Sequence, residues 1–302
     1  MWLSALQMTS RPDIDANLAE IDRILTAHPV NACHKLNESD SDNFNGDDTH
    51  LVVLPECCLY FGGSDQEQLQ LAESLFDLSP GTMQSALAQL AKKHRCYLLA
   101  GSIPTQSAQG TRFHASSLLF SPDGTLLADY QKLHLFDVRV DDNTRSYQES
   151  RYTDPGEKIT CVDINGVKVG FAICYDLRFP ELFRAMRQQG AEVICLPSAF
   201  TQVTGQAHWQ PLLQARAIEN QVYMVAAAQQ GLHANGRETF GHAMVVNPWG
   251  ECQIIDTREQ LSGLVTTQFD KQLLQQVRAS IEVNEHNRFS LQFNAYDKSA
   301  LK

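Results

Sequence analysis

Apolar runs of strand length recur along the whole chain, and most are separated by tight turns or by amphipathic helical segments. The run LVVLP, which starts at Leu51, and the run VKVGFAI, which starts at Val167, are typical of buried strands. Helical periodicity appears elsewhere, as in DIDANLAEIDRILTAH, where Ile14, Leu18 and Ile21 share one helical face. Strands that alternate with helices in this way predict a layered α/β or α+β sandwich.

The remaining elements follow from the same patterns and from turn residues. We expect strands at residues 2–8, 96–103, 117–132 (two strands around a Pro-Asp-Gly turn), 193–200, 221–229 and 243–255, and helices at 80–94, 179–190, from near His208, and 270–281. No repeat, linker or internal boundary interrupts this order, so we predict a single domain over residues 1–302. Within it, the polar, acidic stretch at about 34–49 is predicted to be a mobile loop, and the chain from about 281 onward an extended arm.

The charge and the cysteine content narrow the class of function. The formal net charge is −11, which argues against nucleic acid or an anionic membrane as partner, because phosphate binding needs a basic face. No run reaches the roughly 20 apolar residues that span a bilayer, and the N-terminus lacks the pattern of a secretory signal. The eight cysteines form no CxxC pair. Reduced thiols in a cytoplasmic protein fit this usage best.

Three reactive side chains stand at corresponding places, each at or just after the end of a predicted strand. Glu56 follows LVVLP, Lys132 follows LLADYQ, and Cys174 follows VKVGFAI. Taken singly, such a cysteine is usually a core residue, and such a glutamate or lysine is usually a solvated charge. Strand ends at one rim of a sheet, however, hold a group rigidly while leaving it reachable. The combination therefore predicts one catalytic site.

These residue types suit the hydrolysis of an amide by a thiol. A free cysteine has a pKa of about 8.5 and is mostly protonated at neutral pH, so it needs a base. A carboxylate can take the thiol proton and later return it to the departing amine. An ammonium group and a backbone N–H, for which Tyr175 is the candidate, can stabilise the oxyanion. We therefore predict Cys174 as the nucleophile, Glu56 as the general base and Lys132 as the oxyanion stabiliser.

The surrounding residues resemble the nitrilase superfamily of carbon–nitrogen hydrolases, whose triad is Glu-Lys-Cys. The resemblance rests on LPECCLYFG around Glu56, YQKLHLFD around Lys132 and GFAICYDLRFPEL around Cys174, and it covers nearly the whole chain. It implies an α-β-β-α sandwich that pairs into dimers with a four-layer-sheet core. It also implies a second glutamate between the lysine and the cysteine, a place that Glu149 in YQESRYTDPG matches.

Within the superfamily, the chain resembles the branch that includes the amidase of deaminated glutathione, through LPSAFTQVTGQAHWQPLLQARAIENQVYMVAAAQQG and GHAMVVNPWG. The omega-amidases of 2-oxoglutaramate are near neighbours. Both substrates are small, anionic 2-oxo acid amides, which suits an arginine close to the nucleophile. Arg178 follows Cys174 within CYDLR and is expected to bind the substrate carboxylate. The match also implies that Phe200 and Thr204 line the same pocket.

Other hypotheses stay open at this point. Arg178 could form a structural ion pair with Asp176 or Glu181 instead. The same triad serves nitrilases and N-carbamoyl hydrolases, so the scissile carbon–nitrogen bond is not decided. A non-catalytic binding protein on the same fold is the alternative from a different class. Thiol alkylation that titrates well below pH 8 is expected of the enzyme and not of a scaffold.

The chain lacks the sequence motifs of several other enzyme classes. No G-x-S-x-G elbow, H-E-x-x-H pair or phosphate-binding loop occurs, which argues against serine hydrolases, metallohydrolases and nucleotide enzymes. The ten histidines show no ligand spacing, so we expect no metal and no other cofactor. The expected partners are a small-molecule amide and a second copy of the chain.

Overall fold

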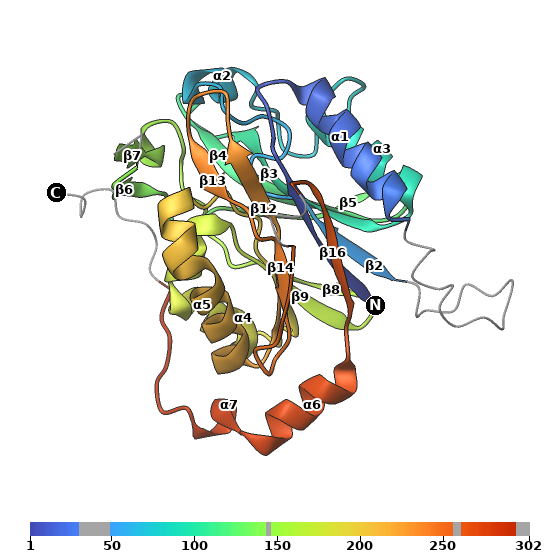
Figure 1. The fold of residues 1–302 in the computed structure, drawn as a ribbon, viewed down its shortest axis with the longest axis vertical. Coiled ribbons are helices and arrows are strands. Elements are labelled where there is room, and N and C mark those ends of the chain that lie inside the picture. The colour runs from blue at the N-terminus through green and yellow to red at the C-terminus, as the bar shows by residue number, and fades with distance from the viewer. Residues whose placement is uncertain (30–48, 143–145, 256–260, 294–302) are drawn as a thin grey trace, which may run out of the picture.

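Two β-sheets between two pairs of helices form the centre of the computed structural model, which describes residues 1–29, 49–142, 146–255 and 261–293 (Figure 1). The first sheet has the strand order β13-β12-β1-β2-β3-β4-β5, and β16 also pairs with β1. Its strands are β1 (Trp2–Met8), β2 (His50–Val53), β3 (Tyr97–Gln106), β4 (Phe113–Phe120), β5 (Leu126–Gln131), β12 (Ala228–Leu232), β13 (Glu238–Phe240) and β16 (Gly263–Gln268). The acidic stretch predicted at about 34–49 lies, apart from Thr49, outside the described residues.

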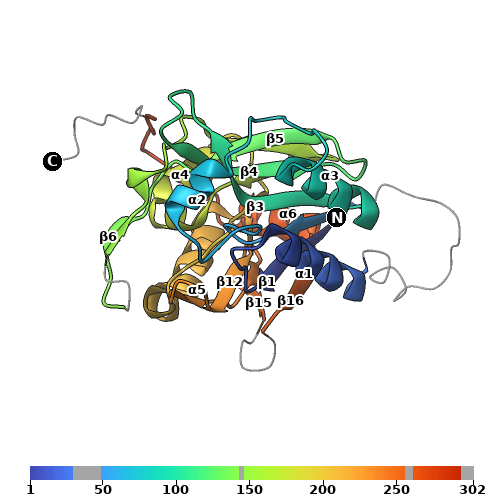
Figure 2. The ribbon, with the colours of Figure 1, turned by 90° about the horizontal axis from the view of Figure 1, so that it is seen from above.

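The second sheet has the strand order β15-β14-β11-β10-β9-β8. Its strands are β8 (Cys161–Ile164), β9 (Val167–Phe171), β10 (Val193–Cys195), β11 (Tyr223–Ala226), β14 (Met244–Val246) and β15 (Cys252–Ile254). A separate hairpin joins β6 (Asp137–Arg139) to β7 (Ser146–Gln148). Figures 1 and 2 both place this hairpin at the side of the molecule away from the first helix.

Helices cover the outer face of each sheet. The helices are α1 (Ile14–Ala27), α2 (Asp65–Gln70), α3 (Met83–His94), α4 (Pro180–Gln188), α5 (Gln202–Asn220), α6 (Lys271–Ser280) and α7 (Val283–His286). In Figure 1, α1 and α3 lie over the first sheet, whereas α4 and α5 lie over the second. The predicted α-β-β-α sandwich is therefore confirmed. Among the described residues, no helix combines the length and the apolar character that crossing a bilayer requires.

The alternation of side chains explains why the strands read as continuous apolar runs. In β2 and the residue after it, Leu51 and Val53 belong to the core between the two sheets. Val52 and Leu54 belong to the cluster beneath α1 and α3. Successive side chains point to opposite faces of a strand, and both faces here are covered, so all four of these positions are apolar.

Capping residues account for helix starts that differ from the predicted ones. The helix expected from residue 80 begins at Met83, because the Thr82 hydroxyl accepts a 3.0 Å hydrogen bond from the Ser85 N–H. The helix expected from near His208 is longer than predicted and begins at Gln202, capped by Thr201. Its Gly205, a weak helix former, permits close packing: a Cβ there would lie 2.2 Å from Cβ of Phe240.

The C-terminal segment is only partly the extended arm that was predicted. It contains the short helix α7 at Val283–His286. Beyond it, Phe289 is 84% exposed and Phe293 is 52% exposed. The prediction of an extended arm did not include α7, because a helix of a single turn has too little periodicity to be recognised in a sequence.

Candidate active site

Cys174 lies in a tight turn between β9 and α4. Its N–H donates a 2.8 Å hydrogen bond to the Pro197 carbonyl, and its backbone φ is +45°, in the left-handed region that non-glycine residues rarely adopt. The residues Cys174–Arg178 form a 3-10 turn, and α4 begins only at Pro180. Arg178 thus ends this turn, just before α4. A strained backbone of this kind persists only where its surroundings hold it.

The fully buried Asp176 holds this turn. Its carboxylate accepts hydrogen bonds from the Ile173 N–H at 2.8 Å and from the Tyr130 hydroxyl at 2.7 Å. It also accepts from the His134 N–H at 3.0 Å, and it lies 2.7 Å from Nδ1 of the His134 ring. The ring of His134 stacks on that of Phe179, with centroids 3.6 Å apart. The turn that carries Cys174 is therefore tied to the segment after β5.

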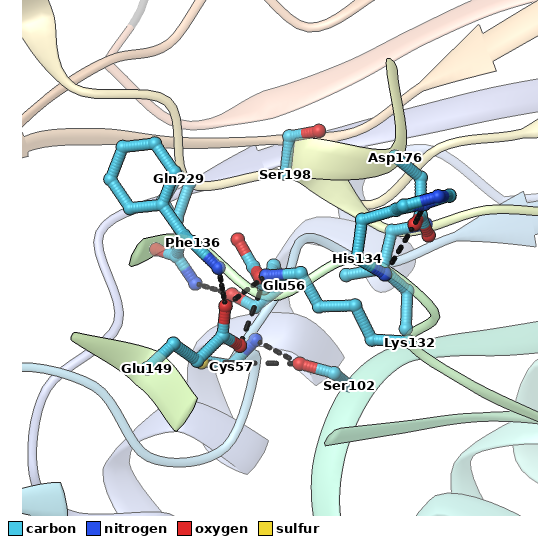
Figure 3. Close-up of polar contacts among 12 residues, drawn as sticks. Glu56, Cys57, Ser102, Lys132, His134, Phe136, Glu149, Asp176, Ser198 and Gln229 are labelled. Carbon is cyan, nitrogen blue, oxygen red and sulfur yellow. Dashed lines mark hydrogen bonds and ion pairs between the residues drawn. The ribbon is translucent and has the colours of Figure 1, made fainter. Parts of the chain in front are cut away.

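Glu56 follows β2 in a place where two backbones approach closely. A Cβ at Gly101 would lie 1.8 Å from the carbonyl oxygen of Pro55, so only glycine fits beside the segment that presents Glu56. The Ser102 hydroxyl then accepts a 2.8 Å hydrogen bond from the Cys57 N–H. The buried Gln229 donates a 2.9 Å hydrogen bond to the Glu56 carbonyl. These contacts fix the backbone of the predicted general base (Figure 3).

Lys132, directly after β5, brings the predicted acidic residues together. Its ammonium lies 2.7 Å from Oε1 of Glu56 and 2.9 Å from Oε2 of Glu149 (Figure 3). Glu149 opens a 3-10 turn after β7 and accepts a further 2.7 Å hydrogen bond from the Phe136 N–H. Lys132 is 2% exposed and Glu56 is 6% exposed, so water screens this cluster poorly. The ammonium is thus held between two carboxylates.

The side chains of Glu56, Lys132 and Glu149 shift one another's pKa values. Burial raises the pKa of the Glu56 carboxyl, but the charge and hydrogen bond of Lys132 outweigh burial, and the pKa lies below its ordinary value. Burial lowers the pKa of Lys132, yet Glu149 and Glu56 raise it well above its ordinary value. Burial raises the pKa of Glu149, and although Lys132 opposes this, the Glu56 charge helps to keep it raised. At neutral pH the Glu56 carboxylate and the Lys132 ammonium are both charged.

The Cys174 thiol faces this carboxylate. Burial is the largest influence on its pKa, and the Glu56 charge adds to it, so the pKa lies well above the ordinary value. This direction runs against the expectation of a thiol that titrates well below pH 8, which an alkylation experiment would test. The Glu56 carboxylate and the Ala199 N–H both lie close enough to the sulfur to influence its pKa. This arrangement suits proton transfer to Glu56 as the sulfur attacks.

All four predicted catalytic residues, Glu56, Lys132, Glu149 and Cys174, line one cavity of about 440 Å³. Apolar and aromatic side chains form much of the remaining wall, including those of Leu59, Tyr60, Phe61, Met83, Phe113, Phe136 and Tyr147. In the part of the chain that the structure describes, no group of three His, Cys, Asp or Glu side chains is arranged to hold a metal ion. The geometry brings together a nucleophile, a base and a cation around a space for a small molecule.

The four predicted substrate-binding residues are not part of this lining. The Arg178 guanidinium lies over the Phe200 ring, 5.3 Å from its centre, and Nη1 is 3.3 Å from Nδ1 of His208. The Thr204 hydroxyl is 2.9 Å from that of the α5 cap Thr201. The Tyr175 ring packs behind Phe136, with centroids 5.2 Å apart. These residues lie around the turn that carries Cys174 and around α5, outside the described lining.

The alternative hypothesis for Arg178, a structural ion pair with Asp176 or Glu181, also differs from what the structure contains. Across the described ranges, neither Asp176 nor Glu181 forms an ion pair with it. Asp176 is occupied by Tyr130, His134 and the backbone instead. Arg216 and Glu219 on α5 form an ion pair, at 2.9 Å.

No sequence pattern indicated that Asp176 anchors the turn, or that Gln229 and Arg237 belong to the site. Asp176 stands two residues after the nucleophile, but a buried carboxylate and a solvated one look alike in a sequence. Arg237 lies in a polar stretch, HANGRE, that signals only a turn. No local pattern indicates that its side chain lines the cavity.

Comparisons with known proteins agree with this geometry. A carbon-nitrogen hydrolase family model matches residues 3–279. The chain belongs to the carbon–nitrogen hydrolase family. The predicted membership of the nitrilase superfamily is thereby confirmed, and the protein is a hydrolase that acts on carbon–nitrogen bonds.

Curated relatives include the deaminated glutathione amidase of Yersinia enterocolitica, 40% identical over 79% of this chain and 82% of the relative. That of Synechocystis is 37% identical over 95% of this chain and 97% of the relative. Among solved structures, the NitFhit protein of C. elegans has a TM-score of 0.80 at 33% identity, covering 97% of this chain and 67% of its own. A Saccharomyces cerevisiae member of branch 10 of the nitrilase superfamily has a TM-score of 0.79 at 29% identity, covering 96% of this chain and 97% of its own.

Proposed function

We propose that this hydrolase is an amidase that cleaves small, anionic 2-oxo acid amides of the deaminated glutathione type through a thioester on Cys174. The observation that carries the proposal is the convergence of Glu56, Lys132 and Cys174 on one cavity. The names of the curated relatives support the substrate class. The alternative of a non-catalytic scaffold does not account for a buried, charged cluster, which costs free energy to maintain away from water.

In the proposed mechanism each residue has a defined role. Glu56 takes the thiol proton as Sγ of Cys174 attacks the amide carbonyl carbon, and the Lys132 ammonium stabilises the resulting oxyanion together with a backbone N–H, for which Tyr175 is the candidate. The C–N bond then breaks, and Glu56 returns the proton to the departing amine. Water, deprotonated by Glu56, attacks the thioester and releases the acid and the thiol. Glu149 positions Lys132 through its two carboxylate oxygens.

Arg178 remains the candidate for binding the carboxylate on the acyl side, with Phe200 and Thr204 beside it. Its place at the end of the nucleophile turn supports this role, as does the absence of an acidic partner within the described residues. A bidentate arginine–carboxylate contact would fix both the charge and the orientation of the substrate.

We also propose that the chain self-associates, with the segment after Ile281 crossing to the partner. Val203 and Ile218 on α5 are 45% and 51% exposed, and Trp249 is 58% exposed. Ile218 and the turn that contains Trp249 are close together, since a Cβ on Gly250 would lie 2.7 Å from the Ile218 Cδ1. An exposed apolar surface of this kind is typical of an interface between subunits.

The test is a panel of 2-oxo acid amides, a nitrile and an N-carbamoyl compound, assayed for release of ammonia or amine by the wild type and by C174A. We expect the wild type to hydrolyse the 2-oxo acid amides best, and its intact mass to show an acyl adduct during turnover. C174A should fold normally and be inactive. Preference for the nitrile or the N-carbamoyl compound would contradict the substrate class, and full activity of C174A would contradict the mechanism.

A further inference from the structure

Arg237 is a second cation at the wall of the catalytic cavity, and the mechanism above does not use it. It immediately precedes β13 and lines the cavity with Glu56 and Cys174. The carbon of its guanidinium lies 5.1 Å from the ring centre of Phe61 and 5.1 Å from that of Tyr147. A planar cation that contacts two aromatic rings is held in a defined place.

The hydrogen-bonding capacity of Arg237 is not used up. One terminal nitrogen, Nη2, donates to the Ala199 carbonyl. The buried Nε has no hydrogen-bond partner in the structure, and among the residues with described positions no carboxylate forms an ion pair with the guanidinium. A guanidinium has five N–H donors and usually recruits a carboxylate or phosphate when it is withdrawn from water. Arg237 is therefore poised to bind an anion in the cavity.

The position of Arg237 indicates which part of a substrate it meets. Phe61 lies in the segment that follows Glu56, so Arg237 borders the side of the cavity on which the base stands. Burial and Lys132 are the largest influences on the pKa of Glu56, and Arg237 adds a further lowering, which agrees with this proximity. Because Glu56 delivers the proton to the departing amine, the amine side of the substrate lies next to Glu56. Arg237 lines the same cavity close to Glu56, so it can meet a group that this amine carries.

The cavity has room for a substituent on the amine. Its volume of about 440 Å³ lies within the range of about 300–1,000 Å³ that is typical of sites for ligands larger than a simple primary amide. An amide that releases only ammonia would leave the part of the cavity around Arg237 without an anion.

We propose that Arg237 determines specificity by binding a carboxylate on the amine side of the substrate. This inference rests on the proposed function. It assigns separate carboxylate sites to the two sides of the scissile bond, with Arg178 as the candidate for the acyl side and Arg237 for the leaving group.

The test compares two 2-oxoglutaric acid γ-amides that differ in one charge, an amide of glycine and an amide of glycinamide. The wild type should show a kcat/KM about 10- to 100-fold higher for the glycine amide, as expected for one charged hydrogen-bonded contact. R237Q should bring this ratio close to one, mainly through KM for the glycine amide. R237K, which keeps the charge but loses the planar fork, should give an intermediate ratio. The control R139Q, which removes an exposed arginine from β6, should keep the wild-type ratio.

Two outcomes would overturn the inference. One is a wild type that hydrolyses both amides equally well, a result that does not depend on how any variant folds. The other is a fall in kcat/KM by the same factor for both amides in R237Q, which would make Arg237 a structural residue. Failure of the proposed function would look different, because the wild type would then hydrolyse neither of these amides.

Discussion

The Tyr130 hydroxyl donates a 2.7 Å hydrogen bond to the carboxylate of Asp176. Tyr130 comes from β5 of the first sheet, and Asp176 comes from the turn that follows a strand of the second. One residue separates Tyr130 from Lys132, and one residue separates Asp176 from Cys174. This bond therefore connects the segment of Lys132, the proposed oxyanion stabiliser, to that of Cys174, the proposed nucleophile, across the two sheets.

We predict that Y130F lowers both stability and activity. The phenyl ring keeps the packing, but Asp176 loses one donor while it stays buried, which should cost about 1–3 kcal/mol in the free energy of unfolding. The fall in kcat should exceed any change in KM, because the turn that carries Cys174 is loosened. Urea unfolding and steady-state kinetics measure the two effects. Y97F, which removes only a 3.4 Å contact at the surface, is the control and should change little. An equally stable and active Y130F would contradict the anchoring role.

The charge of Glu56 predicts an unusual behaviour of E56Q. Burial raises the pKa of the Cys174 thiol most, and the Glu56 carboxylate raises it further, whereas Lys132 lowers it. Glutamine removes the negative charge and leaves the ammonium in place, so the pKa of the thiol should fall. E56Q should therefore lose hydrolysis by several orders of magnitude while iodoacetamide modifies Cys174 at lower pH than in the wild type. Mass spectrometry must locate the adduct, with C174A as the control. An alkylation profile unchanged in E56Q would show that Glu56 does not govern the thiol.

K132M should couple stability to pH. Without the ammonium, the buried carboxyl of Glu56 and the partly buried carboxyl of Glu149 lie side by side, and their pKa values should rise above the unfolded value of about 4.3. The native state then binds more protons than the unfolded state between about pH 5 and pH 8, so the free energy of unfolding falls as the pH rises. We expect a loss of about 3–5 kcal/mol at pH 8, with part of it recovered at pH 5.

Urea denaturation of K132M and of the wild type at both pH values checks this prediction. The double variant E56Q/K132M serves as its control, since it removes one of the two carboxylates and should show a weaker dependence on pH. If the stability of K132M rises with pH instead, the carboxylates are not buried as a pair.

R178K tests the acyl-side carboxylate site. Lysine cannot reproduce a bidentate contact, so kcat/KM for an anionic 2-oxo amide should fall by about 30-fold or more, and far less for a neutral short amide. The free energy that corresponds to this loss is roughly 2–5 kcal/mol. Equal losses for both substrates would mean that Arg178 serves the structure, through its contacts with Phe200 and His208. No loss for either would argue that the acyl side carries no charge.

Self-association can be measured by light scattering at working concentration. We expect the mass of a dimer or a larger assembly, because Ile218 and Trp249 leave an apolar surface in contact with water. W249E should shift the equilibrium toward the monomer. L127E is the matched control, since Leu127 on β5 is 47% exposed but lies on another element. A monomeric wild type would contradict the proposal.

Local sequence patterns were enough to predict most helices and strands and to identify the reactive side chains. The strands that end before Glu56 and Cys174 are buried, so their apolar runs stand out in the sequence. The strand before Lys132 is only partly buried, and the Pro-Asp-Gly turn that precedes it marked its position instead. Helix starts were less accurate, because Thr82 and Thr201 shift them by caps that periodicity does not register. The family resemblance added Glu149, which the structure brings within 2.9 Å of Lys132.

The sequence by itself determined that this is a layered α/β protein of the carbon–nitrogen hydrolase family, since apolar periodicity and short motifs are local properties of a chain. Only the tertiary structure decided which charges meet. Asp176 became an anchor because Tyr130, distant in sequence, donates to it. Arg237 became part of the cavity wall because its guanidinium contacts the rings of Phe61 and Tyr147. Such contacts join residues far apart in the chain, and burial removes the water that would otherwise screen them, so no local pattern carries them.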